Sequence, residues 1–440
     1  MRTSSLEANP ATADAPAVGA PKFRTILPTV VASALEGYDL TIYGLFAGTI
    51  AKQFFPAGDA NLALLLTVAA LGIGYVIRPL GGIVLGAYGD RVGRKAAIFL
   101  TVALMALSTG VMGLIPSYAS IGYWAPVCIL IARIIQGFAA GAGASSSISF
   151  LAEVSPPKRR GFFASWHQTV QVGAFLFASA LGAAISNFVP AEHAGSIGWR
   201  IPFLLALVFG PLAWYIRAKL EEPVLLLNAH RGLRTEDRST DIARSLGKEV
   251  GHIAIGFGVS CLWTITLFLL LIFMPTYANR TFGIPLGGAY TSATIGGCVL
   301  FVLCPVFGRL SDWAGRRATM LTAAILFAVL IYPIFAYVGG ARTVGSLIAA
   351  QIVLSILIAA YTGPIGAFLA ELFATGVRST ALSISNNIAV TVIGSFAPLI
   401  TTFLIRVTHN PLAPAYYIMG GAIVSAIAVF FSRDKTGQSL

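Results

Sequence analysis

Twelve apolar segments, each long enough to cross a lipid bilayer, dominate this sequence. A helix of about 20 residues, rising about 1.5 Å per residue, spans the hydrocarbon layer. The predicted spans are residues 25–50, 62–88, 96–115, 123–151, 162–188, 200–217, 252–274, 287–308, 318–338, 344–369, 380–405 and 415–431. Only 10% of the residues are charged, whereas soluble domains are about one quarter charged. We therefore predict an all-α integral membrane protein with twelve transmembrane helices.

The basic residues indicate how the chain is oriented. The formal net charge is +12. If the N-terminus lies inside, most Lys and Arg residues fall in the even-numbered loops and the two terminal segments, as the positive-inside rule requires. Topology thus explains the basic charge, and no nucleic-acid partner is indicated. Residues 1–22 are rich in Ala and Pro without an apolar core, so we expect a disordered cytoplasmic tail rather than a signal peptide.

A charged motif occurs twice. "GAYGDRVGRK" begins at Gly86 and "GRLSDWAGRR" at Gly308, an offset of 222 residues. A second pair, "AEVSPPKRRG" and "AELFATGVRS", places Glu153 and Glu371 at an offset of 218 residues. Two independent repeats at nearly one offset indicate a duplicated six-helix unit. The predicted organisation is an N-terminal bundle at 23–218, a cytoplasmic linker at 219–250, a C-terminal bundle at 251–432 and a cytoplasmic tail at 433–440.

Two six-helix halves related by an axis along the membrane normal are typical of transporters that rock around a midplane site. In the repeated motif, Asp90 can accept hydrogen bonds from a helix N-terminus, and Arg94 can pair with an acid such as Glu153. Such contacts would close the cytoplasmic side; alternatively, the motifs only fix topology and turn geometry. The residues expected in this gate are Gly86, Asp90, Arg91, Gly93, Arg94, Glu153, Arg160, Asp312, Gly315, Arg316, Glu371 and Arg378.

The loop motif resembles the signature of the major facilitator superfamily. With "YDLTIYG", "RPLGGIVLGAYGDRVGRK", "IPSYASIGYWAP", "RIIQGFAAG", "RGFFASW" and "GWRIPFLL", the chain is similar to the metabolite:proton symporters. This resemblance implies a bacterial inner-membrane importer and a substrate such as citrate, tricarballylate, oxoglutarate, shikimate, proline or betaine. Two positions depart from the family pattern: Gly143 stands where an acidic residue is common in helix four, and Gly37 follows Glu36 where Trp is usual.

Four ionisable residues lie inside apolar segments, where a charge normally faces a cavity or a partner. Glu36 and Asp39 share one face of helix one, and Arg78 and Arg133 lie at a comparable depth. We expect Asp39, Arg133 and Glu36 to couple proton movement, with Arg133 resembling the arginine of the superfamily's RxxQG pattern. Arg78 is a candidate carboxylate ligand. The alternative is a fixed structural ion pair.

Other polar residues within apolar segments are candidate substrate contacts. They are His167, Gln168, Gln171, Tyr361, Asn386 and Asn387. The same groups can instead form hydrogen bonds between helices, and a His near a helix end is often solvated.

These features predict a secondary active transporter rather than an enzyme. The sequence has no HExxH and no GxxxxGK[ST] motif, so zinc hydrolysis and ATP-driven transport are not indicated. We expect proton-coupled import of a small organic acid, either a dicarboxylate or a tricarboxylate. The alternatives are import of a zwitterionic osmolyte such as betaine or proline, and an uncoupled facilitator. No cofactor or metal is expected; the partners are substrate, protons and lipid, and we expect a functional monomer.

Overall fold

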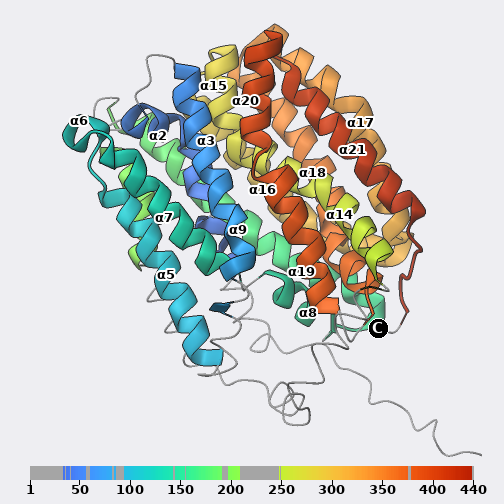
Figure 1. The fold of residues 1–440 in the computed structure, drawn as a ribbon. Coiled ribbons are helices and arrows are strands. Elements are labelled where there is room, and N and C mark those ends of the chain that lie inside the picture. Colours follow the sequence, from blue (N-terminus) through green and yellow to red (C-terminus); the bar gives the residue numbers. More distant parts are fainter. Residues whose placement is uncertain are drawn as a thin grey trace, which may run out of the picture.

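The computed structural model describes residues 33–34, 36–39, 41–55, 60–81, 84–85, 94–141, 144–153, 155–190, 197–208, 247, 249–374 and 378–438. Within these ranges the regular structure is entirely helical. Long helices run side by side, with the first half of the chain (blue to green) beside the second half (yellow to red) (Figure 1). The predicted tail at 1–22 and nearly all of the predicted linker at 219–250 lie outside the described residues.

The first half contains helices that cover most of the first six predicted spans. Described residues between 33 and 46 are largely helical and lead into α2. The elements that follow are α2 (Ala47–Phe54), α3 (Ala60–Val76), α5 (Arg94–Leu114), α6 (Tyr118–Ile121), α7 (Trp124–Ala140), α8 (Ala144–Glu153) and α9 (Arg160–Phe188). Residues 200–208 are also helical. The fourth predicted span, 123–151, is thus covered by α7 and α8 together.

The second half covers the remaining six spans. Its elements are α14 (Val250–Ile265), the π-helical η3 (Thr266–Phe273), α15 (Met274–Phe282), α16 (Leu286–Ala314), α17 (Arg316–Ala341), α18 (Val344–Leu372), α19 (Arg378–Ile388), the π-helical η4 (Ala389–Gly394), α20 (Ala397–Thr408) and α21 (Ala413–Phe431). Hydropathy did not indicate either π-helical segment. A π-helix disturbs the regular pairing of backbone groups, and the Gln351 side chain compensates for this by donating a 2.8 Å hydrogen bond to the Leu270 carbonyl.

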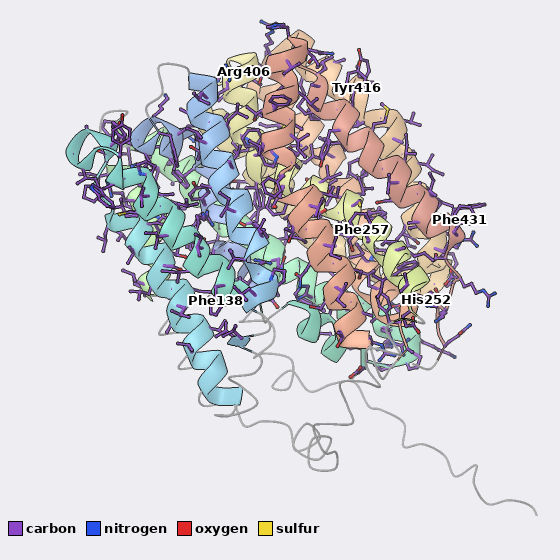
Figure 2. The ribbon with its side chains drawn as sticks, viewed as in Figure 1. Phe138, His252, Phe257, Arg406, Tyr416 and Phe431 are labelled. Carbon is purple, nitrogen blue, oxygen red and sulfur yellow. The ribbon has the colours of Figure 1, made fainter. Side chains whose placement is uncertain are left out.

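The lengths and surfaces of the helices fit a membrane protein. Eight helical stretches of the described chain are long and apolar enough to span a bilayer, and two shorter apolar helices accompany them. Large apolar side chains project from the outside of the bundle; Phe431 at the end of α21, labelled in Figure 2, is 72% exposed. Exposed apolar surface on this scale is unfavourable in water and favourable against lipid. The protein is a multi-pass membrane protein.

The two halves meet most closely where α9 packs against α16. Glycines allow this approach: a Cβ added at Gly161 would lie 2.4 Å from the Gly308 carbonyl oxygen, and one at Gly308 would lie 2.7 Å from Ser165 Cβ. Gly308 opens the second copy of the repeated motif, so one function of that glycine is to let the backbones of the two halves touch.

Candidate functional site

A pocket of polar and charged side chains lies within the first half. It leaves about 290 Å³ unfilled by atoms, including space open to solvent. We call it the polar pocket, and its lining residues are Glu36, Asp39, Gly74, Tyr75, Arg78, Met105, Arg133, Gln136, Gly137 and Ala140. All four ionisable residues predicted to lie at one level of the first half therefore line one pocket.

A directed chain of hydrogen bonds crosses the polar pocket from Arg133 to Asp39. Arg133 Nη1 donates to Gln136 Oε1 within α7. Gln136 Nε2 donates to Thr109 Oγ1 of α5 at 2.7 Å, and Thr109 Oγ1 donates to Asp39 Oδ1. Because Thr109 gives its only proton to Asp39, the oxygen Oδ1 must remain an acceptor. A proton arriving at Asp39 must therefore reside on Oδ2.

Aromatic rings hold the two arginines in place. The Arg133 guanidinium carbon lies 3.5 Å from the centre of the Tyr43 ring, and that of Arg78 lies 4.4 Å from the centre of the Tyr75 ring. Cation–π contacts of this kind are strongest when the cation is desolvated. Arg78 Nη1 also lies 3.4 Å from Glu36 Oε1, and each side chain is 11% exposed. The two arginines of the polar pocket thus have different partners: Arg78 pairs with the acid Glu36, and Arg133 with the amide of Gln136.

The polar pocket exists because α3 and α7 approach each other through glycines. A Cβ added at Gly137 would lie 1.7 Å from the Gly74 carbonyl oxygen, so no larger residue fits there. Gly137 directly follows Gln136, and Gly74 directly precedes Tyr75. Close backbone contact at this point places Tyr75 of α3 and Gln136 of α7 in the lining of the same pocket.

The candidates on α9 lie outside the polar pocket's lining. His167 Nδ1 lies 3.1 Å from Ser33 Oγ, and His167 Nε2 lies 3.2 Å from Gln171 Nε2. Gln168 is buried, and its Nε2 donates no hydrogen bond to any described residue. These three residues form a separate group on α9, which packs against helix one near Gly37.

The candidates in the second half are uncharged and are not gathered into one site. Tyr361 OH donates to the Val259 carbonyl at 2.7 Å, and Asn387 Nδ2 donates to Ser383 Oγ at 3.2 Å. Asn386 is buried, and its Oδ1 accepts no hydrogen bond from the described residues. Tyr361 thus forms a hydrogen bond between helices, whereas Asn386 keeps unused hydrogen-bonding capacity.

One end of the bundle, which we call the latch end, carries the repeated-motif residues Arg160, Asp312, Arg316, Glu371 and Arg378. Asp312 of α16 accepts hydrogen bonds from the backbone amides of Gly161 at 2.7 Å and Phe162 at 3.1 Å. These amides are in the first turn of α9, where unpaired N–H groups and the helix dipole favour an anion. An acid of the second half thus caps a helix of the first.

Two ion pairs cross between the halves at the latch end. Arg160 Nη1 lies 2.5 Å from Glu371 Oε1, and Arg378 Nη1 lies 2.8 Å from Glu153 Oε1. Each arginine also uses Nε to bond the carbonyl eight residues before it, at 3.1 Å for Arg160 and 2.7 Å for Arg378. The two ion pairs occupy equivalent positions in the two repeated halves, but their acids differ in burial. The Glu371 side chain is 5% exposed and that of Glu153 is 47% exposed.

Glu371 binds a second arginine, and the end of the chain covers this cluster. Arg316 Nη1 lies 2.6 Å from Glu371 Oε2, and Arg316 Nη2 lies 3.1 Å from Asp312 Oδ1. Thr436 Oγ1 accepts from the Arg316 backbone amide at 3.1 Å, and the Gln438 carbonyl accepts from Arg160 Nη1 at 3.0 Å. Residues 436–438 therefore contact both halves.

Most of the first copy of the repeated motif lies outside the described residues. Gly86, Asp90, Arg91 and Gly93 lie outside the described residues, as does Gly143, and of Arg94 only the backbone is described, at the start of α5. Gly315, in the second copy, joins α16 to α17 with φ of 90°, a conformation that favours glycine.

Enlarging Gly308 is expected to disrupt the latch end. A Gly308→Val side chain would collide with α9, so the contact between the halves should weaken and transport should fall about tenfold or more. Gly420→Val on α21 is the matched control, because a Cβ there meets nothing within 4 Å. Uptake by reconstituted protein measures the effect, and equal activity of the two variants would contradict it.

Sequence reasoning did not single out Thr109, Gln136 and Tyr75, and it considered Tyr43 only as a possible aromatic contact for a quaternary ammonium substrate. Gln136 belongs to the RxxQG pattern around Arg133 and could have been taken from it. Thr109 carries a weaker signal, since one hydroxyl in an apolar helix usually bonds its own backbone. Tyr75 reads as an ordinary core residue, although it lies three residues before the Arg78 that it contacts. The contact of Tyr43 with Arg133 depends on how helix one packs against α7.

Comparisons with known proteins agree with this architecture. The model of the Major Facilitator Superfamily matches residues 29–398. A "Putative proline/betaine transporter" of Staphylococcus aureus (strain COL) is 32% identical over 427 residues, covering 95% of this chain and 90% of that protein. A "Citrate-proton symporter" of Klebsiella pneumoniae is 31% identical over 422 residues, covering 96% and 94%. The partially occluded, inward-open structure of the xylose transporter XylE from E. coli superposes with a TM-score of 0.76 at 17% identity, covering 95% and 99%.

Proposed function

Because the chain belongs to the major facilitator superfamily, a family of membrane transporters, we propose that it imports a small organic acid together with protons by alternating access. The polar pocket is the main support for this proposal. Asp39 and Arg133 both line it, and one carboxylate oxygen of Asp39 has no hydrogen-bond partner among the described residues. A buried carboxylate with a free oxygen is a proton acceptor, and a buried guanidinium beside it favours an anionic substrate.

In this proposal Asp39 is the proton carrier, and Arg133 responds to its charge. When Asp39 is ionised, the chain through Thr109 and Gln136 orients toward it. When Asp39 is protonated, the polar pocket gains one positive charge relative to the ionised state. An incoming anion then restores the balance, which links substrate entry to proton entry. Glu36, paired with Arg78, adjusts the charge of the same cavity.

A zwitterionic osmolyte is the second candidate substrate. Relatives named as a proline/betaine transporter and as a citrate-proton symporter match the chain to nearly the same extent. The polar pocket also offers Glu36 and the Tyr75 ring to a cationic group that displaces Arg78 from them. An organic acid uses both arginines, whereas a zwitterion uses one arginine and one acid.

The latch end is proposed to face the cytoplasm and to be closed in this conformation. The crossed ion pairs and the Asp312 cap hold the halves together at that end. The predicted topology assigns most Lys and Arg residues to the same side as the repeated motifs, as expected of cytoplasmic loops. Rocking would break these contacts and release substrate inward.

Transport currents and uptake in proteoliposomes test the proposed function. Citrate, tricarballylate, oxoglutarate, shikimate, betaine and proline are each supplied with an inward acid gradient, and a protonophore and protein-free liposomes serve as controls. We expect gradient-driven accumulation of an organic acid that the protonophore abolishes. Uptake that equilibrates without responding to the gradient would identify an uncoupled facilitator instead, and accumulation of betaine or proline alone would identify an osmolyte importer.

A further inference from the structure

Unpartnered polar atoms concentrate in the polar pocket. Among all described residues, thirteen buried side-chain N and O atoms have no hydrogen-bond partner. Four of these atoms belong to three residues that line the polar pocket. They are Arg133 Nε, Arg133 Nη2, Tyr75 OH and Asp39 Oδ2. Burying such groups without partners is costly. A cluster of them indicates a ligand that satisfies all of them at once.

The two arginine atoms have the geometry of a carboxylate fork. Arg133 Nη1 is used by Gln136, and the Tyr43 ring covers a face of the guanidinium. The Nε and Nη2 atoms lie in the guanidinium plane, on the edge away from Nη1. Their two N–H groups are parallel and match the two oxygens of a carboxylate. Arg78, by contrast, already faces Glu36.

Resting on the proposed function, we propose that one substrate carboxylate binds the Nε–Nη2 edge of Arg133, with Tyr75 OH and a proton on Asp39 Oδ2 as its further donors. An ionised carboxylate accepts about four hydrogen bonds, and these atoms supply four donors only when Asp39 is protonated. Since Oδ1 is occupied by Thr109, the added proton has one place to go. Neither arginine atom is exposed in this conformation, so the carboxylate reaches them when the halves rock apart.

This assignment identifies the feature that organic acids and zwitterionic osmolytes share. Both classes carry at least one carboxylate, which the Arg133 fork would bind in either case. The rest of the molecule then meets Arg78 and Glu36: a second carboxylate would draw Arg78 away from Glu36, whereas a cationic group would approach Glu36. Small changes around this pair are thus sufficient to change the substrate class.

The charged groups around Asp39 come from three elements of the described chain. Glu36 is on its own helix, Arg78 follows α3, and Arg133 is on α7. Helix α5 contributes only the neutral Thr109 and Met105 to this region, and on α9 the titratable His167 faces Ser33. Asp39 and Glu36 are the carboxyls that line this pocket, and Glu36 faces Arg78. The part of the pH dependence that Asp39→Asn removes is therefore assigned to the single proton on Asp39.

Equilibrium binding to purified wild-type protein, without any gradient, tests the carboxylate assignment. The compound that the transport panel identifies is compared with its primary amide, for example proline with prolinamide. We expect the amide to bind about 100-fold more weakly, because it is neutral and has only one acceptor oxygen for the two N–H groups of Arg133. Binding of the amide within threefold of the acid would overturn the proposal, and since the protein is unaltered, misfolding cannot explain either result.

Variants separate the roles of the residues. Arg133→Lys keeps the positive charge but loses the two parallel N–H donors of the guanidinium. We expect affinity to fall about 30-fold for either substrate class. With a polyacid, Arg78→Gln should weaken binding as well; with a zwitterion, Glu36→Gln should do so instead. Unchanged affinity in Arg133→Lys would contradict the assignment. A correctly folded variant is identified by an unaltered melting temperature.

The proton requirement has its own readout, a pH profile of binding. Wild-type affinity should fall about tenfold per pH unit once Asp39 is ionised. The Asp39→Asn amide accepts at Oδ1 and donates from its nitrogen, so this variant should bind at pH 8 as tightly as the wild type does in acid. Asp39→Ala should bind weakly throughout. If the affinity of Asp39→Asn fell with pH as steeply as that of the wild type, the assignment of the required proton to Asp39 would be overturned.

The outcomes for the two proposals are distinguishable. Proton-driven uptake combined with equal binding of acid and amide would retain the proposed function and reject the carboxylate fork. Carboxylate-selective binding through Arg133 without gradient-driven uptake would do the reverse.

Discussion

Asp39→Asn is expected to abolish proton-driven accumulation, lowering it about 100-fold or more, while leaving exchange of substrate across the membrane intact. The neutral amide preserves the hydrogen bond from Thr109 but has no group that binds and releases a proton in the working pH range. Substrate can therefore bind and the halves can rock, although no gradient drives net movement. Uptake under an inward acid gradient, compared with counterflow of labelled substrate at equal pH, measures the two activities separately.

Glu249→Gln is the matched control for this variant. It also removes one carboxylate, but Glu249 pairs with His252 outside the polar pocket, at a distance of 2.6 Å between His252 Nδ1 and Glu249 Oε2. This variant should accumulate substrate as the wild type does. Loss of counterflow together with accumulation in Asp39→Asn would indicate that Asp39 is needed for binding or folding rather than for coupling.

Glu371→Gln is expected to open the latch end far more than the equivalent change at Glu153. Glu371 lies 2.5 Å from Arg160 and 2.6 Å from Arg316. Removing its charge leaves the buried Arg160 guanidinium without an ion-pair partner among the described residues, and leaves Arg316 with Asp312 alone. Breaking a buried pair in this way costs about 3–5 kcal/mol, a shift of 100-fold or more in a conformational equilibrium. Net uptake should fall in proportion, because the cycle can no longer return to the closed conformation.

The duplication supplies the control, Glu153→Gln. Glu153 is 47% exposed and pairs with one buried arginine, Arg378, rather than with two, so its loss should shift the equilibrium less than the loss of Glu371 does. Native Cys304, whose Sγ lies 3.9 Å from the Ser165 carbonyl across the halves, reports opening by its rate of maleimide labelling once the other three cysteines are replaced. Equal labelling rates in the two variants would contradict the prediction.

The sequence predicted the large features because they follow from hydropathy and repetition. Twelve spans were expected, and helices of the described chain lie within each of them, although only parts of 25–50, 62–88, 123–151 and 200–217 are described; α7 and α8 share one span. Membership in the superfamily followed from the motif that begins at Gly86 and returns at Gly308. The π-helical segments η3 and η4 could not be foreseen, because a single-residue widening of a helix leaves apolar periodicity nearly unchanged.

The polar pocket was only partly predictable for a different reason. Depth along a helix can be counted, so Glu36, Asp39, Arg78 and Arg133 could be placed at one level. Which groups touch depends on how helices rotate and approach, and the chain through Thr109 needs α5 and α7 to meet helix one. Likewise, the second copy of the motif indicated an acid able to cap a helix, but not that Asp312 caps α9 of the other half.

The contact of residues 436–438 with both halves has a consequence for the end of the chain. Thr436 binds Arg316 in one half, and Gln438 binds Arg160 in the other. In the proposed cycle, in which the halves separate at the latch end, these two hydrogen bonds cannot both persist, so residues 436–438 must release one of them in each turn. The segment is thereby a tether whose release is timed by the cycle itself. Any factor that traps it in the detached form would hold the transporter open toward that face.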